Sequence, residues 1–356
     1  MSLLKSKTFC ILPWIEKFQH LDGLNYLCCQ SNIPVQSDEI DSIRIKIQNN
    51  QAVPHCESCY KLDQQRVISP RLRESARWLK DPEVKSFIDK WAPGDPESTF
   101  FYDLRFNNKC NLACICCDPT ASSLWARELG IKIQSQPLRF AEDDIIKSKK
   151  IYMAGGEPFI IDQFIDLLAR VSKQEQQPEI VINTNLSRLD HDMQKNLQQI
   201  KNLTLVISVD AFGRVNEYHR WPMKWNKFVN NLSWAKDIGC TIQFNTVIDA
   251  ISVMNAADLV DIEHYCDQWN LTVLTDPESL HVSNLPSKIK SDVKNHWQKI
   301  KTSKFFNTDI TFKSCVNHVT DLIDQPGDCE ALNRYITQLD KRRNIQYENF
   351  LPMKLS

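Results

Sequence analysis

The feature that most constrains this 356-residue chain is a cysteine-rich segment, CNLACICC, that begins at Cys110. Cys110, Cys114 and Cys117 have the spacing C-x3-C-x2-C. The segment follows an extended run, Phe101–Phe106, and precedes a helical stretch, Ala121–Leu129. Three thiolates on one loop can hold three irons of a cubic [4Fe–4S] cluster and leave the fourth iron open to a small molecule. The alternative is a set of buried or zinc-binding cysteines.

A second motif follows after one more predicted strand. The extended run Lys150–Ala154 leads into Gly155, Gly156, Glu157 and Pro158. Glycines let the main chain approach a ligand because no side chain intervenes. With both motifs in this order, the chain resembles the radical S-adenosylmethionine (SAM) enzymes. The resemblance implies that the three cysteines bind a [4Fe–4S] cluster, that its open iron binds SAM, and that the GGEP segment lines the methionine end of SAM.

Composition narrows the class of protein. The net charge is −1 and 42% of the residues are apolar, so no basic excess indicates nucleic-acid binding. No apolar run is long enough for a membrane span or a signal peptide. Thirteen cysteines without a secretion signal favour metal or cluster ligation over disulfides. We therefore expect a cytoplasmic protein with no membrane and no nucleic-acid partner.

The N-terminal part contains a predicted β-hairpin. Asp22-Gly23 lies between the extended runs Glu16–Leu21 and Leu24–Cys29, and an Asp-Gly pair between such runs favours a tight turn. Cys10, the hairpin glycine and Cys28 follow the pattern C-x12-G-x4-C. A hairpin would therefore bring Cys28 back towards Cys10.

Cys56 and Cys59 add a chelating C-x2-C pair after a predicted helix. Residues 1–66 resemble the twitch domain, the shorter relative of the SPASM domain, placed here before the radical SAM core rather than after it. The resemblance implies that Cys10, Cys28, Cys56 and Cys59 bind a second, auxiliary [4Fe–4S] cluster. A structural zinc site is the alternative for these four cysteines.

Two neighbouring cysteines are set apart from the ligands. Cys29 is adjacent to Cys28, and successive residues of an extended strand point in opposite directions, so we expect Cys29 to pack; it remains the alternative ligand. Cys116 takes a position that is commonly aromatic in the resembled family. As a fourth ligand it would close the open iron site, so we expect it to be non-ligating.

From residue 99 to about 276, predicted strands and helices alternate, which indicates parallel strands with outer helices. Six β/α units are too few for a closed eight-stranded barrel. The resemblance implies an α/β fold: a partial (β/α)6 TIM-type barrel with its ligands at the carboxyl ends of the strands. The predicted strands are Phe101–Phe106, Lys150–Ala154, Glu179–Asn183, Leu203–Val209, Thr241–Val247 and Leu271–Leu274.

Polar residues end several of these strands. By resemblance, Ser208 and Asn245 are assigned to the ribose or methionine side of SAM, with Asp210 as a second contact; capping a strand is the alternative for each. Where relatives have glycines in the T-N-G and S-x-D-G patterns, this chain has Leu186 and Ala211. That departure puts the backbone path and the detailed SAM contacts in question.

The domain prediction is a twitch domain at 1–66, a helical linker at 67–98, a radical SAM core at 99–276 and a helical C-terminal extension at 277–356. Arg71, Arg73 and Arg77 in the linker are expected on a solvent-exposed helix face, with carboxylate binding as the alternative.

The resemblance implies reductive cleavage of SAM to a 5′-deoxyadenosyl radical, which takes a hydrogen atom from a substrate. The expected substrate is a ribosomally synthesised peptide that is crosslinked, epimerised or rearranged, possibly presented by a separate adaptor protein. A flavodoxin- or ferredoxin-like protein is the expected electron donor. The alternatives are a small-molecule, nucleotide or sugar substrate, or a non-enzymatic zinc or iron–sulfur protein. No catalytic side chain can be assigned from the sequence.

Overall fold

The computed structural model describes residues 6–64, 68–96, 98–133, 137 and 139–355. Its centre is one eight-stranded sheet in the order β2-β1-β3-β4-β5-β6-β7-β8. Every neighbouring pair from β1 and β3 through β7 and β8 is parallel, and only β1 and β2 are antiparallel. The order is sequential from β3 onward, as repeated right-handed β/α units produce.

The strands are β1 Glu16–Gln19, β2 Asn25–Tyr26, β3 Phe101–Leu104, β4 Lys150–Met153, β5 Glu179–Thr184, β6 Leu203–Ser208, β7 Thr241–Ile248 and β8 Gln268–Val273. The α-helices are α1 Leu12–Ile15, α2 Ile40–Gln48, α3 Glu57–Gln64, α4 Pro70–Trp78, α5 Pro82–Lys90, α6 Ser123–Glu128, α7 Glu142–Lys147, α8 Asp162–Val171, α9 His191–Gln198, α10 Gly213–His219, α11 Trp225–Asp237, α12 Ser287–Trp297, α13 Lys304–Thr308, α14 Ile310–Asp324 and α15 Cys329–Arg343. The 3-10 helices are η1 Ser37–Glu39, η2 Pro54–Cys56, η3 Pro158–Ile160, η4 Ser252–Met254, η5 Ala256–Tyr265, η6 Glu278–Leu280, η7 Val282–Asn284, η8 Gln298–Thr302 and η9 Tyr347–Asn349.

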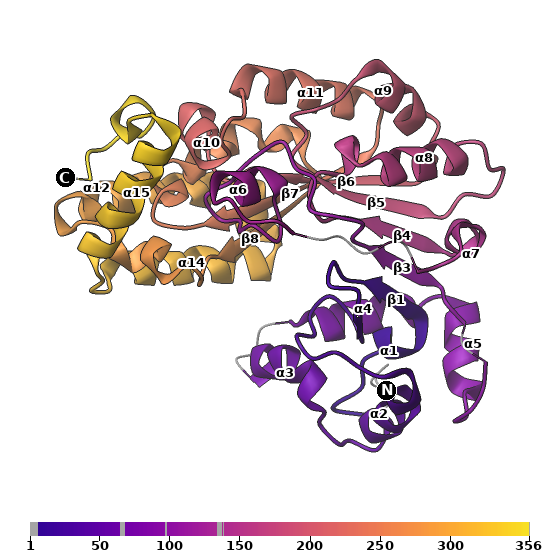
Figure 1. Ribbon diagram of the computed structural model, residues 1–356. Helices are drawn as coiled ribbons and strands as arrows, with labels where there is room; N and C mark the ends of the chain where they lie inside the picture. Colours follow the sequence, from indigo (N-terminus) through magenta and orange to yellow (C-terminus); the bar gives the residue numbers. More distant parts are fainter. Residues whose placement is uncertain (1–5, 65–67, 97, 134–136, 138, 356) are drawn as a thin grey trace.

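The two faces of the sheet differ in composition because side chains alternate along a strand. In β7, Ile242 and Phe244 are fully buried, whereas Gln243 and Asn245 between them are half-buried. The apolar face packs against α8, α9 and α11, which lie together on one side of the sheet (Figure 1). The more polar face is the opposite one, and it carries the side chains available to a ligand.

The N-terminal region lies on that opposite side, next to β1 and β3 (Figure 1). The predicted hairpin is present, with Phe18 opposite Tyr26. Its first strand also pairs in parallel with β3, Glu16 opposite Phe101, so the hairpin extends the main sheet. A second hydrophobic cluster, separate from the main core, fills this region and includes Phe9, Ile11 and Trp14. Where the domains divide stays a prediction.

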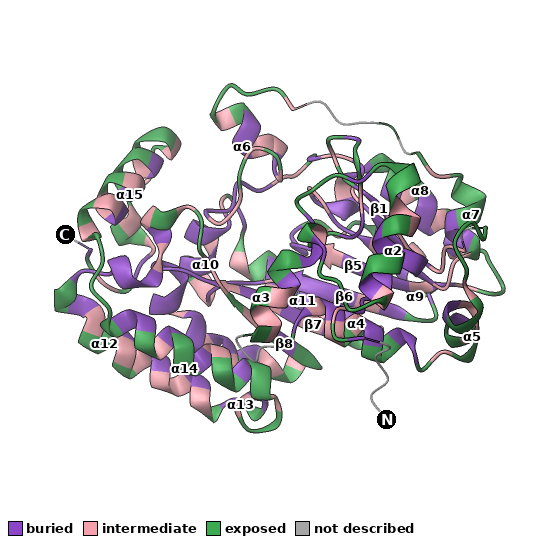
Figure 2. Ribbon diagram, turned by 90° about the horizontal axis from the view of Figure 1, so that it is seen from below, coloured by how far each residue is buried: buried purple, intermediate pink, exposed green. Residues whose placement is uncertain are grey.

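The C-terminal helices lie at the β8 end of the sheet, and the outer faces of α12 and α14 are exposed (Figure 2). Trp297 of α12 and Phe312 of α14 are buried in the main core, so this part shares a core with the sheet.

The predicted α/β fold with a partial TIM-type barrel is confirmed. Two details differ from the sequence prediction. The last strand begins at Gln268 rather than at Leu271, because the exposed Gln268 and Asn270 alternate with the buried Trp269 and so hide the strand pattern. Within the described residues, no helix is both long enough and apolar enough to cross a membrane.

Candidate functional site

The cysteine loop (residues 110–117) follows β3 at the carboxyl edge of the sheet. Two of its three predicted ligands are in direct contact: a hydrogen bond with Cys117 lowers the pKa of Cys114 to about 6. Burial raises the pKa of Cys110 to about 12, and the nearby Cys114 adds to that effect. The structure therefore brings the three thiols together at one point.

The loop backbone is held by hydrogen bonds from outside the loop. Ser122, the N-cap residue of α6, donates its hydroxyl to Leu112 O at 2.5 Å. Trp125 Nε1 donates to Cys114 O at 2.6 Å. From the other side, Ala113 N donates to Trp221 O at 2.6 Å, just beyond α10. These bonds restrict the positions of the sulfur atoms before any ligand is bound.

The GGEP segment packs directly against the start of the loop. Gly155 and Gly156 have φ values of +81° and +54°, in the left-handed region that favours glycine. A Cβ atom on Gly156 would lie 2.3 Å from Lys109 O, one residue before Cys110. Glu157 N donates to the same oxygen at 2.8 Å. Gly156 is thus required for contact between the two motifs, in addition to any contact with a ligand.

Glu157 connects the GGEP segment to the end of β5. Its carboxylate accepts hydrogen bonds from Thr184 Oγ1 at 2.6 Å, Asn185 N at 2.7 Å and Phe159 N at 3.1 Å. The side chain is buried, and burial raises its pKa to about 7. Glu157 is therefore satisfied by the protein, and Pro158 begins a 3-10 helix directly after it.

The end of β5 reaches the cysteine loop through Asn185. Its Nδ2 donates to Asn111 Oδ1 at 3.3 Å and lies 3.9 Å from Cys110 Sγ. The next residue, Leu186, has a φ of +53° although it is not glycine, and it is fully buried. The departure from T-N-G thus leaves the chain in the left-handed conformation that glycine adopts most easily.

Asp210 lies in a buried charge network beside the loop. Its carboxylate contacts His219 Nδ1 at 2.9 Å and Arg220 Nε at 2.8 Å, and it accepts a hydrogen bond from Val247 N at 2.9 Å. Burial alone would raise the pKa of Asp210, but the charges of Arg220 and His219 outweigh burial and hold it below its usual range. The Asp210 carboxylate is therefore satisfied by protein groups.

Two further contacts extend this network. His219 Nε2 lies 2.6 Å from Asp249 Oδ2, and Arg220 Nη1 donates to Cys114 Sγ at 3.6 Å. Burial opposes protonation of His219, but the carboxylates of Asp249 and Asp210 raise its pKa well above the usual value. A chain of charged groups thus leads from Asp249 to a predicted ligand sulfur.

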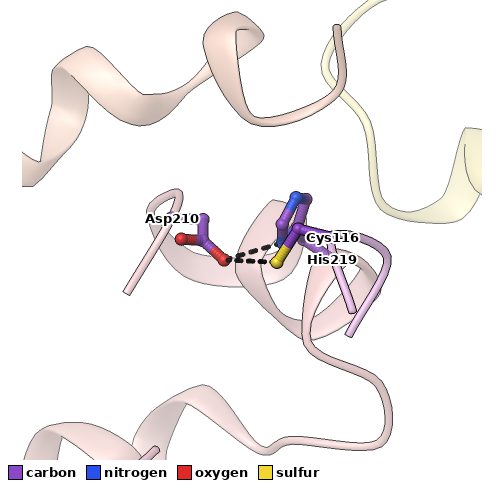
Figure 3. A group of neighbouring side chains, drawn as sticks. All are labelled: Cys116, Asp210 and His219. Carbon is purple, nitrogen blue, oxygen red and sulfur yellow. Dashed lines mark hydrogen bonds and ion pairs between the residues drawn. The ribbon is translucent and has the colours of Figure 1, made fainter. Parts of the chain in front are cut away.

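Cys116, Asp210 and His219 have their ligand atoms within 4.8 Å of one another, close enough to suggest a metal site (Figure 3). Cys116 Sγ lies 4.0 Å from Asp210 Oδ2. The guanidinium of Arg220 lies against the same oxygen, and both His219 nitrogens face carboxylates. A cation here would compete with an arginine, so an ion-pair network explains the group better than a metal site.

Ser208 and Asn245 are neighbours on the polar face of the sheet. They are paired in register on β6 and β7, and Asn270 of β8 is paired with Asn245. Ser208 Oγ donates to Asn183 Oδ1 at 3.2 Å. All four side chains are half-buried or exposed. They form a row of polar groups across four strands, open to a ligand.

The four N-terminal cysteines predicted as ligands lie near one another. Burial raises the pKa of Cys10, and Cys56 and Cys59 raise it further. Burial likewise raises the pKa of Cys28, with a contribution from Cys10. We call Cys10, Cys28, Cys56 and Cys59 the N-terminal cysteine group; their chemistry, thiols alone, fits either an iron–sulfur cluster or zinc.

Cys29 points to a different environment. Burial raises its pKa to about 12, and the charges that act on it are those of Asp103, Glu16 and Arg105. These groups belong to the polar face of β1 and the end of β3, away from Cys56 and Cys59. The placement agrees with the prediction that Cys28, rather than Cys29, belongs to the N-terminal cysteine group.

One expectation from the sequence needs correction. Arg71, expected on an exposed helix face, is 4% exposed. Its Nη1 donates to Phe9 O at 2.6 Å, and its guanidinium pairs with Asp63. The arginine therefore holds α4 against the segment that carries Cys10, because a buried guanidinium needs partners.

Comparison with known proteins adds the family. A model of the Radical SAM superfamily matches residues 104–266. The chain contains a radical SAM domain. This domain makes the protein an enzyme, as predicted from the sequence, and it covers the cysteine loop, the GGEP segment and the strand ends described above.

Two curated relatives are both GTP 3′,8-cyclases. The one from Campylobacter lari is 26% identical over 161 residues, 45% of this chain and 49% of the relative. The one from Mycolicibacterium smegmatis is 27% identical over 176 residues, 47% of each chain. The chain thus spans about half the length of the curated relatives it matches. Among solved structures, Streptococcus suis SuiB has a TM-score of 0.41 and 16% identity, covering 76% of this chain and 63% of SuiB.

The sequence did not single out Arg220 as a site residue. The signal was present in the His219-Arg220 pair that follows the end of β6, but its meaning depends on Asp210 and Cys114 lying next to it. Those contacts join residues about one hundred positions apart, so spacing alone does not reveal them.

Proposed function

We propose that the protein is a radical SAM enzyme in which Cys110, Cys114 and Cys117 hold a [4Fe–4S] cluster with one open iron. The observation that carries the proposal is the contact between the cysteine loop and the GGEP segment, with Gly156 against Lys109 O, inside a radical SAM domain. When bound, such a cluster supplies the electron that cleaves SAM to a 5′-deoxyadenosyl radical, which takes a hydrogen atom from the substrate.

The chain's own residues have distinct tasks in this proposal. The loop carries three ligand sulfurs, and Arg220 donates a hydrogen bond to the sulfur of Cys114. Hydrogen bonds to ligand sulfurs are one of the means by which proteins set cluster potentials. Gly155 and Gly156 leave main-chain groups accessible beside the loop. Glu157 and Asp210 then act through position: both are buried and hold neighbouring segments in place.

SAM and substrate are placed on the polar face of the sheet. Ser208 and Asn245 are the proposed contacts to the ribose or methionine side of SAM, because both project from strand ends into the half-exposed polar row. The N-terminal cysteine group is proposed to bind an auxiliary [4Fe–4S] cluster in a twitch-like domain. A flavodoxin- or ferredoxin-like donor completes the scheme.

The proposed substrate remains a peptide, on the analogy of twitch-like enzymes, with an adaptor protein as a further proposed partner. A nucleotide is the second candidate, because both curated relatives are named GTP 3′,8-cyclase. The two candidates differ in a direct assay. With SAM and dithionite, GTP should raise 5′-deoxyadenosine formation above the background only if the nucleotide is the substrate; a short peptide encoded beside the gene should do so in the other case.

The central test is SAM cleavage by anaerobically reconstituted protein. Wild type should contain about eight irons, two cubane clusters, and form 5′-deoxyadenosine with a strong reductant. Cys110→Ala should abolish cleavage while the protein stays folded. Cys240→Ala, which changes a cysteine at the start of β7 rather than in either group, should retain cleavage. Cleavage by Cys110→Ala would refute the ligand assignment, and protein that binds only zinc would refute the enzymatic proposal.

A further inference from the structure

The C-terminal helix α15 contacts the cysteine loop, although it lies well outside the matched domain, which ends at residue 266. Arg343, the last residue of α15, donates from Nη2 to Ala113 O at 2.6 Å. Tyr335, two turns earlier, places its hydroxyl 3.4 Å from Ile115 O. Both acceptors flank Cys114. A helix from the far end of the chain therefore binds the backbone on either side of a proposed ligand.

Arg343 is fixed on all sides. Its side chain is 1% exposed, and Nε donates to Glu128 at 3.3 Å at the end of α6. Its guanidinium lies 4.9 Å from the ring centre of Trp125, and Trp125 in turn donates to Cys114 O. One cation thus joins α15, α6 and the loop. A buried guanidinium with so many partners holds a defined geometry, because each lost partner leaves a desolvated charge.

The remaining polar groups of the loop are satisfied by two other elements. Ala113 N and Ile115 N donate to Trp221 O and His219 O, at the end of α10. The same helix is tied to α15, since Tyr218 donates its hydroxyl to Asp340 at 2.8 Å. The loop backbone between Leu112 and Ile115 is therefore clamped between α6, α10 and α15.

We propose that Arg343, assisted by Tyr335, is a positioning residue that holds the cysteine loop in its ligand-binding shape. The proposal rests on the proposed function in one respect: the loop is taken to bind the SAM cluster. It adds that the site is completed by a helix outside the radical SAM domain, so cluster retention depends on a side chain more than two hundred residues from the ligands. Such outer partners typically change metal affinity by about 10- to 100-fold when removed.

The test compares four single variants of the full-length protein. Arg343→Ala removes the bond to Ala113 O, and Arg343→Lys restores a cation that can reach it. Tyr335→Phe removes only the hydroxyl. Arg342→Ala is the matched control: it removes the same charge from an exposed neighbour whose guanidinium lies 5.7 Å from the same Trp125 ring. Within the described residues no hydrogen bond joins Arg342 to the loop.

Two measurements are made on each variant. The first is hydrogen exchange of residues 110–117 in metal-free protein, with β7 as the internal reference. The second is the rate of iron loss to a chelator after reconstitution. In Arg343→Ala we expect both rates to rise about 10-fold while β7 is unchanged. Arg343→Lys should recover part of the loss, Tyr335→Phe should show a smaller change of the same sign, and Arg342→Ala should match wild type.

Equal effects in Arg343→Ala and Arg342→Ala would overturn the proposal, because charge alone would then explain them. Unchanged loop exchange in Arg343→Ala would also overturn it. If Arg343→Ala does not fold, Tyr335→Phe decides: no change in loop exchange counts against the proposal. A failure of the proposed function is distinguishable, since a chain that binds no cluster still gives a loop-exchange result in the metal-free protein.

Discussion

The two cysteine groups of this chain are built in opposite ways. The cysteine loop takes three sulfurs from eight consecutive residues, and hydrogen bonds from three helices fix its backbone. The N-terminal cysteine group draws on a segment before α1, the end of the hairpin, the 3-10 helix η2 and the helix α3. Local sequence defines the first group, whereas the packing of four separate pieces defines the second.

What holds the N-terminal pieces together is mainly a small hydrophobic cluster. It contains Cys10, Cys28 and Cys56 together with Trp14 and Ile47. Two buried arginines add to it by binding backbone carbonyls: Arg71 binds Phe9 O, and Arg44 binds Pro13 O at 2.8 Å. A region this small buries little apolar surface, and bound metal commonly supplies part of the folding energy of such regions. We therefore expect the N-terminal group to depend on its metal far more than the loop does.

The largest expected effect separates the two groups by their iron. Cys59→Ala should lower the iron content from about eight to about four atoms per chain, because the auxiliary cluster is lost, while the loop keeps its own. SAM should still alter the electron paramagnetic resonance signal of the remaining cluster. Cys29→Ala is the control, and it should retain all the iron. Loss of iron in Cys29→Ala together with retention in Cys59→Ala would reverse the assignment of the N-terminal ligands.

A smaller effect is expected when the packing rather than a ligand is changed. Trp14 is 2% exposed at the centre of the N-terminal cluster, and truncating a buried tryptophan costs about 3–5 kcal/mol. Trp14→Ala should therefore destabilise the N-terminal region and speed loss of its iron to a chelator. Loop iron, measured by SAM cleavage, should be retained.

Trp297→Ala is the matched control in the other core, since Trp297 is fully buried in α12. It should cost a similar free energy of unfolding and leave the N-terminal iron in place. If Trp14→Ala instead released iron from both groups at the same rate, the two regions would behave as one cooperative unit, and the contrast between them would be lost.

The same contrast explains what the sequence could predict. Cys110, Cys114 and Cys117 are recognisable because their spacing is local, and the alternating strands after residue 99 follow from side-chain periodicity. The pairing of β1 with β3 was not predictable, because it joins residues more than eighty positions apart through backbone hydrogen bonds that carry no side-chain pattern.

Buried polar side chains were the other gap. Asp210 has the sequence position of a ligand contact, yet its carboxylate is used by His219 and Arg220. Arg343 belongs to a basic triplet that looks exposed, yet its side chain is buried against the loop. A charged residue in a sequence indicates exposure by default, and only the position of its partners in space shows the exceptions.

The smallest expected effect tests how strictly the surroundings of the loop are built. Leu186 holds a left-handed φ of +53°, which costs a non-glycine residue about 1 kcal/mol, and its side chain is fully buried. Leu186→Ala loses the burial and keeps the strain, whereas Leu186→Gly loses the burial and removes the strain. The glycine variant should therefore be as stable as the alanine variant or more stable by up to about 1 kcal/mol in denaturant unfolding.

At Leu167, in the middle of α8 and 2% exposed, the order should reverse, because glycine is about 1 kcal/mol worse than alanine inside a helix. Both Leu186 variants should keep the loop iron, since Asn185 remains bound to Glu157 and to Asn111. If alanine is the more stable choice at both positions, the backbone at Leu186 relaxes without cost. The end of β5 would then be adaptable, and the rigidity of the loop would come from α6, α10 and α15 alone.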